Sequence, residues 1–453
     1  MVGQASQQAP KEIANVATST RRAVRRWLRP GSVALLVLLY CGLWNLAARL
    51  PLNRTDLDAF FLPAASVALS GHPLQAYSVR FLEIYPNANG PLSLAPLTLA
   101  AAIASWQGWL GDMELRRVVV MTICAPFVLL MAREAVQAVD QLRGKRLSGA
   151  GRFAAYALFA LSPEVWHGML FYGHIEQPIM LWLALAGIRQ LIRQRPGRAG
   201  ALLGLALLTR SSALMLVLPL AALLARDRRW AALGRFGGTL AGTVGVLLLP
   251  FLLADRGDVV YSLLTFRGML PVGGGSLWGL TVGTPLESFG QRYDGLAVVL
   301  VALLLTAVVV VRRRDLTLAS PSLYLLLALS SLCFALLIKT LWPYYFLEPF
   351  TFLTIWWLGV MPRTAGRFSA WLRWGLALAL PCAAVACAGI REYGLTLELR
   401  QGLLRPESIV LTTAMLLMMG IILWLLLARP RDSSRSWLFA SAVDSQPMPS
   451  DSL

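Results

Sequence analysis

Charged residues are scarce in this chain, and acidic residues are fewer than basic ones. Only 14% of the 453 residues are charged, with 23 Asp and Glu against 41 Lys and Arg. Soluble globular domains carry about 25% charged residues, so a large soluble domain is excluded. The five cysteines lie within apolar runs and lack metal-type spacing, so neither a disulfide nor a zinc site is expected. They are Cys41, Cys124, Cys333, Cys382 and Cys387.

Apolar residues are abundant instead. The chain is 57% hydrophobic, its mean hydropathy is +0.63, and apolar runs long enough to cross a bilayer recur from end to end. This pattern predicts an all-α polytopic membrane protein with about 12 transmembrane helices. The expected spans are 31–50, 116–138, 151–164, 178–189, 199–209, 212–225, 234–254, 295–311, 320–338, 345–361, 371–388 and 408–428.

The net charge of +18 indicates topology rather than nucleic-acid binding. With the N-terminus inside, most Lys and Arg fall in inner tails and short inner loops, as the positive-inside rule requires. The predicted order is a cytoplasmic basic N-tail (1–30), a transmembrane domain (31–430) and a disordered cytoplasmic C-tail (431–453). We therefore expect a multi-pass cell-membrane protein in contact with anionic lipid, and no nucleic-acid partner.

Two outer loops, 51–115 and 255–294, are long, and long loops in compact proteins are usually functional. In the first, the segment from Asp56 to Ser70 predicts a short interfacial helix that stops at Gly71. Residues 92–105 predict a re-entrant or juxtamembrane helix.

Asp56 and Asp58 lie at the start of the first loop. Carboxylates at the edge of a membrane frame are costly unless they have a function, so at least one is predicted to be catalytic. The alternative is that Asp56, or the adjacent Thr55, only caps the helix.

Three polar residues, His174, Glu176 and Gln177, lie where the second outer loop enters the next span. Side chains of these types at a membrane edge can bind sugar hydroxyls or a phosphate. The alternative is ordinary interfacial polarity. A divalent metal on His174 and Glu176 is conceivable, but the spacing indicates no third ligand.

Two cations, Arg210 and Lys339, stand at the outer ends of apolar runs, and a third, Arg267, lies in the loop 255–294. A lone Arg210 is costly unless it meets an anion, and a guanidinium suits phosphate. Lys339 precedes an aromatic cluster that could itself be an interface belt. Arg267 and the glycines Gly273–Gly275 suggest a mobile cover over the site.

Taken together, these residues resemble the GT-C superfamily of membrane glycosyltransferases, most closely the bacterial mannosyltransferase-like glycosyltransferase family 87. The likeness reaches to about residue 360. Two departures are the spacing from Asp56 to Gly71, which is one residue longer than in the family, and Arg210, which stands where a Lys is usual. The matching motifs are Asp56-Leu57-Asp58-Ala59-Phe60-Phe61, Ala64-Ala65, Gly71-His72-Pro73, Tyr85-Pro86, Pro91-Leu92, Gly173-His174-Ile175-Glu176-Gln177, Gly204-Leu205-Ala206-Leu207-Leu208-Thr209-Arg210 and Trp342-Pro343-Tyr344-Tyr345.

The resemblance implies a GT-C fold and a polyprenyl-phosphate sugar as donor, with mannose favoured and a glycolipid or glycan as acceptor. Asp56 or Asp58 would be the general base in an inverting transfer, with no cofactor or metal required. Arg210, Lys339 and Arg267 would bind the donor phosphate. Sugar and acceptor contacts would come from His174, Glu176, Gln177, Tyr85, Tyr344 and Tyr345.

Two other classes of function remain open. Charges within a membrane protein can mark the path of a transporter or flippase, although no inverted repeat is detectable. A non-catalytic assembly subunit is the third reading, and it applies if both aspartates are dispensable. The sequence does not indicate an oligomeric state.

Overall fold

The computed structural model describes residues 39–43, 56–81, 85–109, 111–362, 368–401 and 405–428. In these ranges the chain is helical apart from two strands of two residues each. The predicted tails, Thr55 and most of the first expected span lie outside the described residues. Five described helices are long and apolar enough to cross a membrane: Glu114–Leu142, Trp230–Ala254, Leu286–Arg312, Ala370–Leu395 and Pro406–Leu427.

Helices occupy the segments that the apolar runs predicted. The first group comprises α5 (Met113–Leu142), α6 (Gly149–Ala160), α7 (Pro163–Phe171), α8 (Glu176–Ile192), α9 (Pro196–Thr209), α10 (Leu214–Arg226) and α11 (Trp230–Ala254). The second comprises α14 (Leu286–Arg312), α15 (Ser322–Leu337), α16 (Leu347–Gly359), α17 (Phe368–Ala377), α18 (Ala379–Gln401) and α19 (Arg405–Leu427). The expected span 371–388 lies within the candidate span Ala370–Leu395, in which the single turn residue Leu378 separates α17 from α18. Single turns, η3 (Ser211–Ala213) and η6 (Pro343–Phe346), precede α10 and α16.

The segment 51–115, predicted as the first outer loop, contains the two helices predicted for it. The first comprises η1 (Leu57–Phe61) and α3 (Leu62–Leu69), and Gly71 follows with a φ of +94°, as expected for a helix stop. The second is α4 (Pro91–Trp106), which covers the predicted 92–105. Between them lie η2 (Pro73–Gln75) and the antiparallel strands β1 (Arg80–Phe81) and β2 (Tyr85–Pro86).

Two segments predicted as loops are largely helical. The outer loop 255–294 contains α12 (Arg256–Val260), η4 (Tyr261–Thr265), α13 (Phe266–Met269), η5 (Leu277–Thr281) and the start of α14. The segment 389–407 is mostly a continuation of α18. Its charges suggested a loop, but the buried Arg391 guanidinium donates to Glu407 Oε1 at 2.6 Å, so the helix continues with its charge paired.

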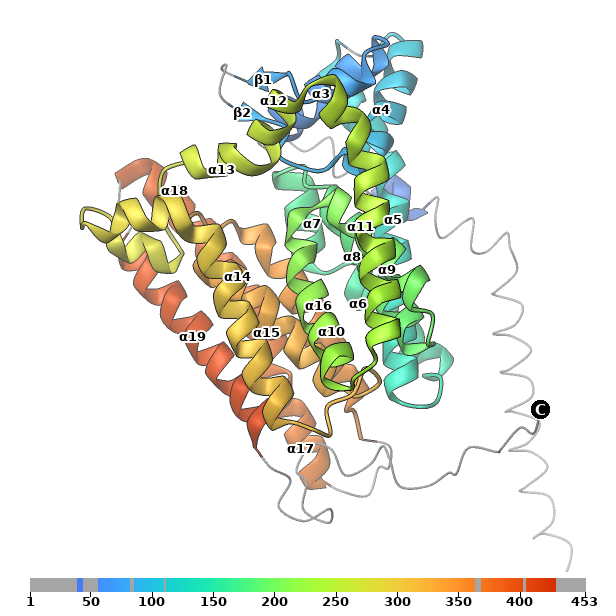
Figure 1. The fold of residues 1–453 in the computed structure, drawn as a ribbon, viewed down its shortest axis with the longest axis vertical. Coiled ribbons are helices and arrows are strands. Elements are labelled where there is room, and N and C mark those ends of the chain that lie inside the picture. Colours follow the sequence, from blue (N-terminus) through green and yellow to red (C-terminus); the bar gives the residue numbers. More distant parts are fainter. Residues whose placement is uncertain are drawn as a thin grey trace, which may run out of the picture.

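The helices pack as two groups beneath a cap (Figure 1). In one group α8 lies between α5 and α9, and α9 packs on α11; in the other, α15 contacts α14, α16 and α19. Contacts of α5 with α16, and of α10 with α14 and α15, join the groups. The cap contains α3, α4, both strands and α12. Arg80 of β1 forms an ion pair with Asp258 of α12, so the two long segments predicted as outer loops are tied together.

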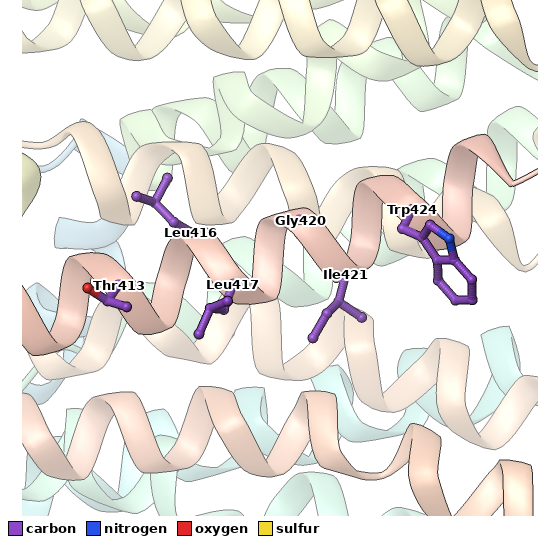
Figure 2. Close-up of a pocket in the computed structure, with 6 residues that line it drawn as sticks. All are labelled: Thr413, Leu416, Leu417, Gly420, Ile421 and Trp424. Atoms are coloured by element: carbon purple, nitrogen blue, oxygen red, sulfur yellow. The ribbon is translucent and has the colours of Figure 1, made fainter.

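The outward faces of several helices are apolar. In α11 only Phe236 is buried, and Val246 and Leu253 are more than two-thirds exposed. Figure 2 shows a shallow groove of about 440 Å³ on α19, lined by Thr413, Leu416, Leu417, Gly420, Ile421 and Trp424. Such uncharged surfaces suit contact with lipid and offer no group for chemistry.

Candidate active site

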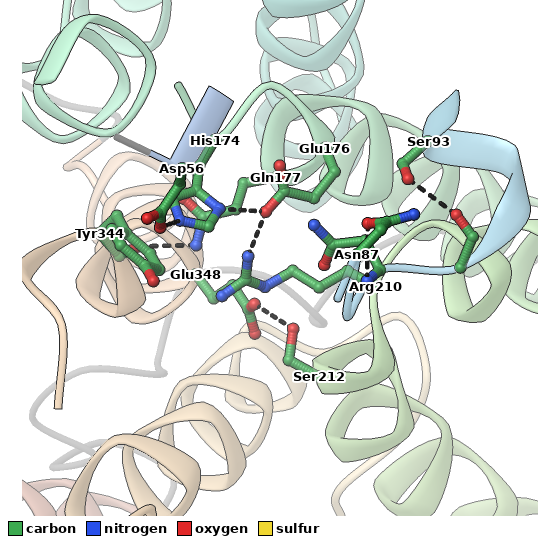
Figure 3. Close-up of polar contacts among 12 residues, drawn as sticks. Asp56, Asn87, Ser93, His174, Glu176, Gln177, Arg210, Ser212, Tyr344 and Glu348 are labelled. Atoms are coloured by element: carbon green, nitrogen blue, oxygen red, sulfur yellow. Dashed lines mark hydrogen bonds and ion pairs between the residues drawn. The ribbon is translucent and has the colours of Figure 1, made fainter. Parts of the chain in front are cut away.

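Asp56 points into the protein at the start of η1 (Figure 3). Its Oδ2 atom lies 2.9 Å from Nε2 of His174, 118 residues away in the sequence. Its side chain makes no capping hydrogen bond to the helix that it begins. The Asp56 carboxylate therefore does not cap the helix by a hydrogen bond, and the alternative that Asp56 only caps the helix is wrong in this respect.

His174 is the second member of a continuous row of four ionisable side chains. Its Nδ1 atom lies 2.5 Å from Glu176 Oε1, and the same oxygen accepts a hydrogen bond from Arg210 Nη1 at 2.5 Å. Four segments of the chain therefore meet here: the start of η1, the loop before α8, the first turn of α8, and the end of α9. We call Asp56, His174, Glu176 and Arg210 the charged row.

Only one end of the charged row is accessible. The side chains of His174, Glu176 and Arg210 are 7%, 1% and 3% exposed, whereas that of Asp56 is 22% exposed. Charges of opposite sign alternate along the row when the imidazole is protonated, which compensates the cost of burying them. Asp56 is thus the carboxylate that a second molecule can reach.

Burial and neighbouring charge act in opposite directions on this row. Burial lowers the pKa of His174, but Glu176 and Asp56 outweigh it, so the pKa is raised. Burial raises the pKa of Glu176, but His174 and Arg210 outweigh it, so that pKa is lowered. Both directions favour an imidazolium beside a carboxylate, and an imidazolium can donate from both of its nitrogens.

Aromatic side chains enclose the row. The ring of Tyr344 lies 3.8 Å from that of His174, and Phe61 meets the same imidazole edge-on at 5.6 Å. The Arg210 guanidinium lies over Tyr344 and Tyr345 at 5.4 and 5.2 Å, within cation–π range. The predicted residues Tyr344 and Tyr345 therefore come together with the predicted cation Arg210.

Two glycines allow the loop and the frame to approach this closely. Gly173 has a φ of +73°, and a Cβ there would lie 2.4 Å from Leu57 Cβ. A Cβ at Gly90 would lie 1.9 Å from the carbonyl oxygen of Leu208. The first approach sets η1 against the His174 turn, and the second sets the start of α4 against the end of α9, next to Arg210.

Asp58 faces a different environment from Asp56. It forms ion pairs with Arg117 and, at 3.3 Å, with Arg116, both in the first turns of α5. Residues two apart on a helix point in different directions, as the structure shows. The two aspartates, which the sequence left as competitors, are thus separated: Asp58 fastens η1 to α5, and Asp56 joins the charged row.

The remaining predicted residues are dispersed. The Lys339 ammonium donates to the backbone oxygen of Gln291 on α14 at 3.0 Å. Arg267 lies in α13 and Tyr85 in β2, and the side chains of both fall outside the described part of the chain. Gln177 lies beside the charged row and donates from Nε2 to the backbone carbonyl oxygen of Tyr344 at 2.8 Å.

Sequence reasoning missed Glu348 and Asn87. Glu348 accepts a hydrogen bond from Ser212 Oγ at 2.5 Å and is 3% exposed, and its charge helps to raise the pKa of Arg210, which burial alone would lower. An acid inside an apolar run was the signal available for Glu348. Asn87 is 1% exposed and lies beside Arg210 in Figure 3.

Four buried polar atoms around the row have no hydrogen-bond partner among the described residues. Two are donors and two are acceptors, so the interior around the row has hydrogen-bonding capacity that the described protein groups do not satisfy. They are Asn87 Nδ2, Arg210 Nε, Glu176 Oε2 and Gln177 Oε1.

A metal on His174 and Glu176 gains no further ligand from the described residues, in which no group of three His, Cys, Asp or Glu side chains is placed to hold one. No family model and no curated protein matches the chain.

Proposed function

We propose that the chain is a membrane glycosyltransferase. It transfers a hexose, with mannose favoured, from a polyprenyl-phosphate donor to a lipid, glycan or other acceptor at the extracytoplasmic face. The observation that carries this proposal is the partly exposed Asp56 carboxylate, held 2.9 Å from the buried His174 in a row that ends at Arg210. The finer architecture, a GT-C fold with about 12 spans and cytoplasmic termini, is part of the same proposal.

Asp56 is the general base in this scheme. It takes the proton of an acceptor hydroxyl while the acceptor oxygen forms a bond to the anomeric carbon, and the bond from that carbon to the phosphate oxygen breaks. Attack opposite the leaving group inverts the anomeric centre. The departing phosphate carries the negative charge. The Arg210 guanidinium, which is 3% exposed in this structure, must become accessible to the donor to neutralise that charge.

The contacts favour a change of role for two residues. His174 and Glu176 were predicted to bind sugar or acceptor, but their side chains are engaged with each other and with Asp56 and Arg210. We assign them as positioning residues that hold the base and the phosphate-binding cation. Gln177, with an unpartnered Oε1, keeps its predicted role as a ligand to sugar or acceptor. The roles of Lys339, Arg267 and Tyr85 stay predictions.

The test uses the purified protein in vesicles with radiolabelled polyprenyl-phosphate mannose and a membrane lipid extract as acceptor. Transfer by the wild type and its loss in Asp56→Asn are the expected results. Asp58→Asn is the matched control, since it removes the same charge two residues away. Undiminished transfer in Asp56→Asn overturns the base assignment, and labelled substrate that crosses the bilayer without a new glycosidic bond favours a transporter.

A further inference from the structure

A second polar pocket lies at the far end of α5 from the charged row. Arg116 and Arg117, which hold Asp58, begin this helix, and Asp140 is near its end. At 1.5 Å per residue, Arg116 and Asp140 are about 36 Å apart along the axis, on the order of a bilayer's thickness. The pocket therefore faces the membrane surface opposite to the candidate active site.

The pocket has a volume of about 470 Å³. Its wall combines the end of α5, the following turn, the start of α6 and the end of α8. Every lining side chain is polar, and four of the seven are arginine: Gln137, Asp140, Gln141, Arg146, Arg152, Arg189 and Arg193.

Acidic groups neutralise only part of this positive charge. Arg189 is paired with the buried Glu134 at 2.8 Å, and Arg152 lies 3.6 Å from Asp140. Asp140 also accepts a hydrogen bond from the backbone N–H of Leu147 at 2.8 Å, which holds the turn that carries Arg146. Arg146 and Arg193 are the two lining cations that form no ion pair with a carboxylate within 4.0 Å among the described residues, although the charge of Arg193 also acts on Glu134. The pocket thus retains a local charge of about +2.

The surface beside the pocket is apolar. Phe153, which follows Arg152 on α6, is 66% exposed, and Leu158 and Leu161 further along are 38% and 51% exposed. Polar groups at the end of the helix followed by an apolar face match a lipid, with its headgroup at the surface and its chains along α6. A free anion would contact the arginines but not this apolar face.

From this arrangement we propose that the pocket binds the phosphate of an anionic lipid headgroup, with an acyl chain lying against Phe153 of α6. One arginine guanidinium can donate two parallel hydrogen bonds to the oxygens of a phosphate. Arg146 and Arg193 supply the uncompensated charge. The site is independent of the glycosyl-transfer proposal, since none of its residues belongs to the charged row.

The experiment measures binding of dioctanoyl phosphatidylglycerol to the detergent-purified full chain by calorimetry. The double variant Arg146→Gln/Arg193→Gln is expected to weaken binding about tenfold or more, and both residues are exposed, so the fold should persist. Arg314→Gln is the matched control, because Arg314 is an exposed arginine outside the pocket and should leave affinity unchanged. Equal losses in the double variant and the control overturn the proposal.

Two further arms separate the possible sources of the phosphate. Phe153→Gln should weaken lipid binding several-fold. Inorganic phosphate should compete poorly with the lipid for binding to the wild type. Displacement of the lipid by inorganic phosphate at equal concentration would show a free-anion site and overturn the lipid assignment. Dioctanoyl phosphatidylcholine, which has no net charge, should bind less tightly, and equal affinity for it also overturns the proposal.

Discussion

His174 Nε2 lies 2.9 Å from Asp56 Oδ2. His174, just before α8, therefore orients the carboxylate of Asp56, just before η1. The relationship resembles the general arrangement in which a reactive group is held by a second residue, itself oriented by a third. Glu176 is the third residue here. Activity should therefore depend on His174 even though His174 is 7% exposed.

Replacing His174 by Gln should lower transfer more than it lowers affinity for the donor. Gln can donate one hydrogen bond to Asp56 but cannot carry the positive charge, so we expect a loss in kcat of about 10²-fold or more. Steady-state kinetics with polyprenyl-phosphate mannose measures this loss. His72→Gln is the control, because His72 is exposed; equal losses in both variants would contradict the positioning role.

Stability should depend on pH through the same residue. The pKa of His174 is raised above its ordinary 6.5, so its contribution is fully present below 6.5 and is lost as pH rises through the raised value. The pKa of Glu176 is lowered below 4.5, so its contribution is lost only as pH falls through that lower value. Thermal unfolding in detergent should show the alkaline decline in the wild type and a smaller one in His174→Gln.

Arg210 should be required for its charge more than for its shape. Arg210→Gln leaves buried Glu176 with His174 as its remaining cationic neighbour and removes the phosphate partner, so transfer should fall by about 10²–10³-fold. Arg210→Lys keeps the charge and should retain more transfer than Arg210→Gln. Initial rates at saturating donor measure both, and equal rates in the two variants would show that the charge is unnecessary.

Asp58 should matter for stability and not for chemistry. Asp58→Asn weakens its links to Arg116 and Arg117, and since Asp58 is 17% exposed we expect a loss of about 1–3 kcal/mol. A double-mutant cycle with Arg117→Gln measures the coupling from thermal or denaturant unfolding. A variant with unchanged stability and abolished transfer would give Asp58 the catalytic place instead.

Gly173→Ala should weaken the contact between η1 and the frame. The φ of +73° and the 2.4 Å approach to Leu57 both oppose a Cβ, which should cost on the order of 2 kcal/mol or more. Gly238→Ala is the control, because a Cβ there meets nothing within 4 Å. Equal unfolding temperatures for both variants would show that the close approach is not needed.

The sequence predicted local structure better than long-range contacts. Apolar runs located the helices, and Gly71 located the end of α3, because these signals depend on neighbouring residues. Segments with charged residues were predicted as loops but are helical. Glu287 and Asp294 belong to α14, and Arg391 belongs to α18. A buried partner such as Glu407 neutralises such a charge, and that partner becomes visible only in three dimensions.

The candidate site shows the same division. Asp56, His174, Glu176 and Arg210 were all singled out from their positions at the membrane edge, but the row that joins them spans 118 residues between its first two members. Nothing in the local pattern fixes which carboxylate faces the imidazole. Packing at Gly173 decides it, since this glycine sets η1 against the turn that holds His174.

The charged row has its accessible carboxylate on the first outer loop and its other three members on the helical frame. The loop is therefore not an exchangeable part. A hybrid that takes residues 51–115 from another protein would fold its own helices, yet it would provide a working site only if its aspartate met a histidine in register on the recipient. Loop and frame must be inherited together. A larger side chain at position 173 would require a smaller one at position 57, because the two residues are in close contact.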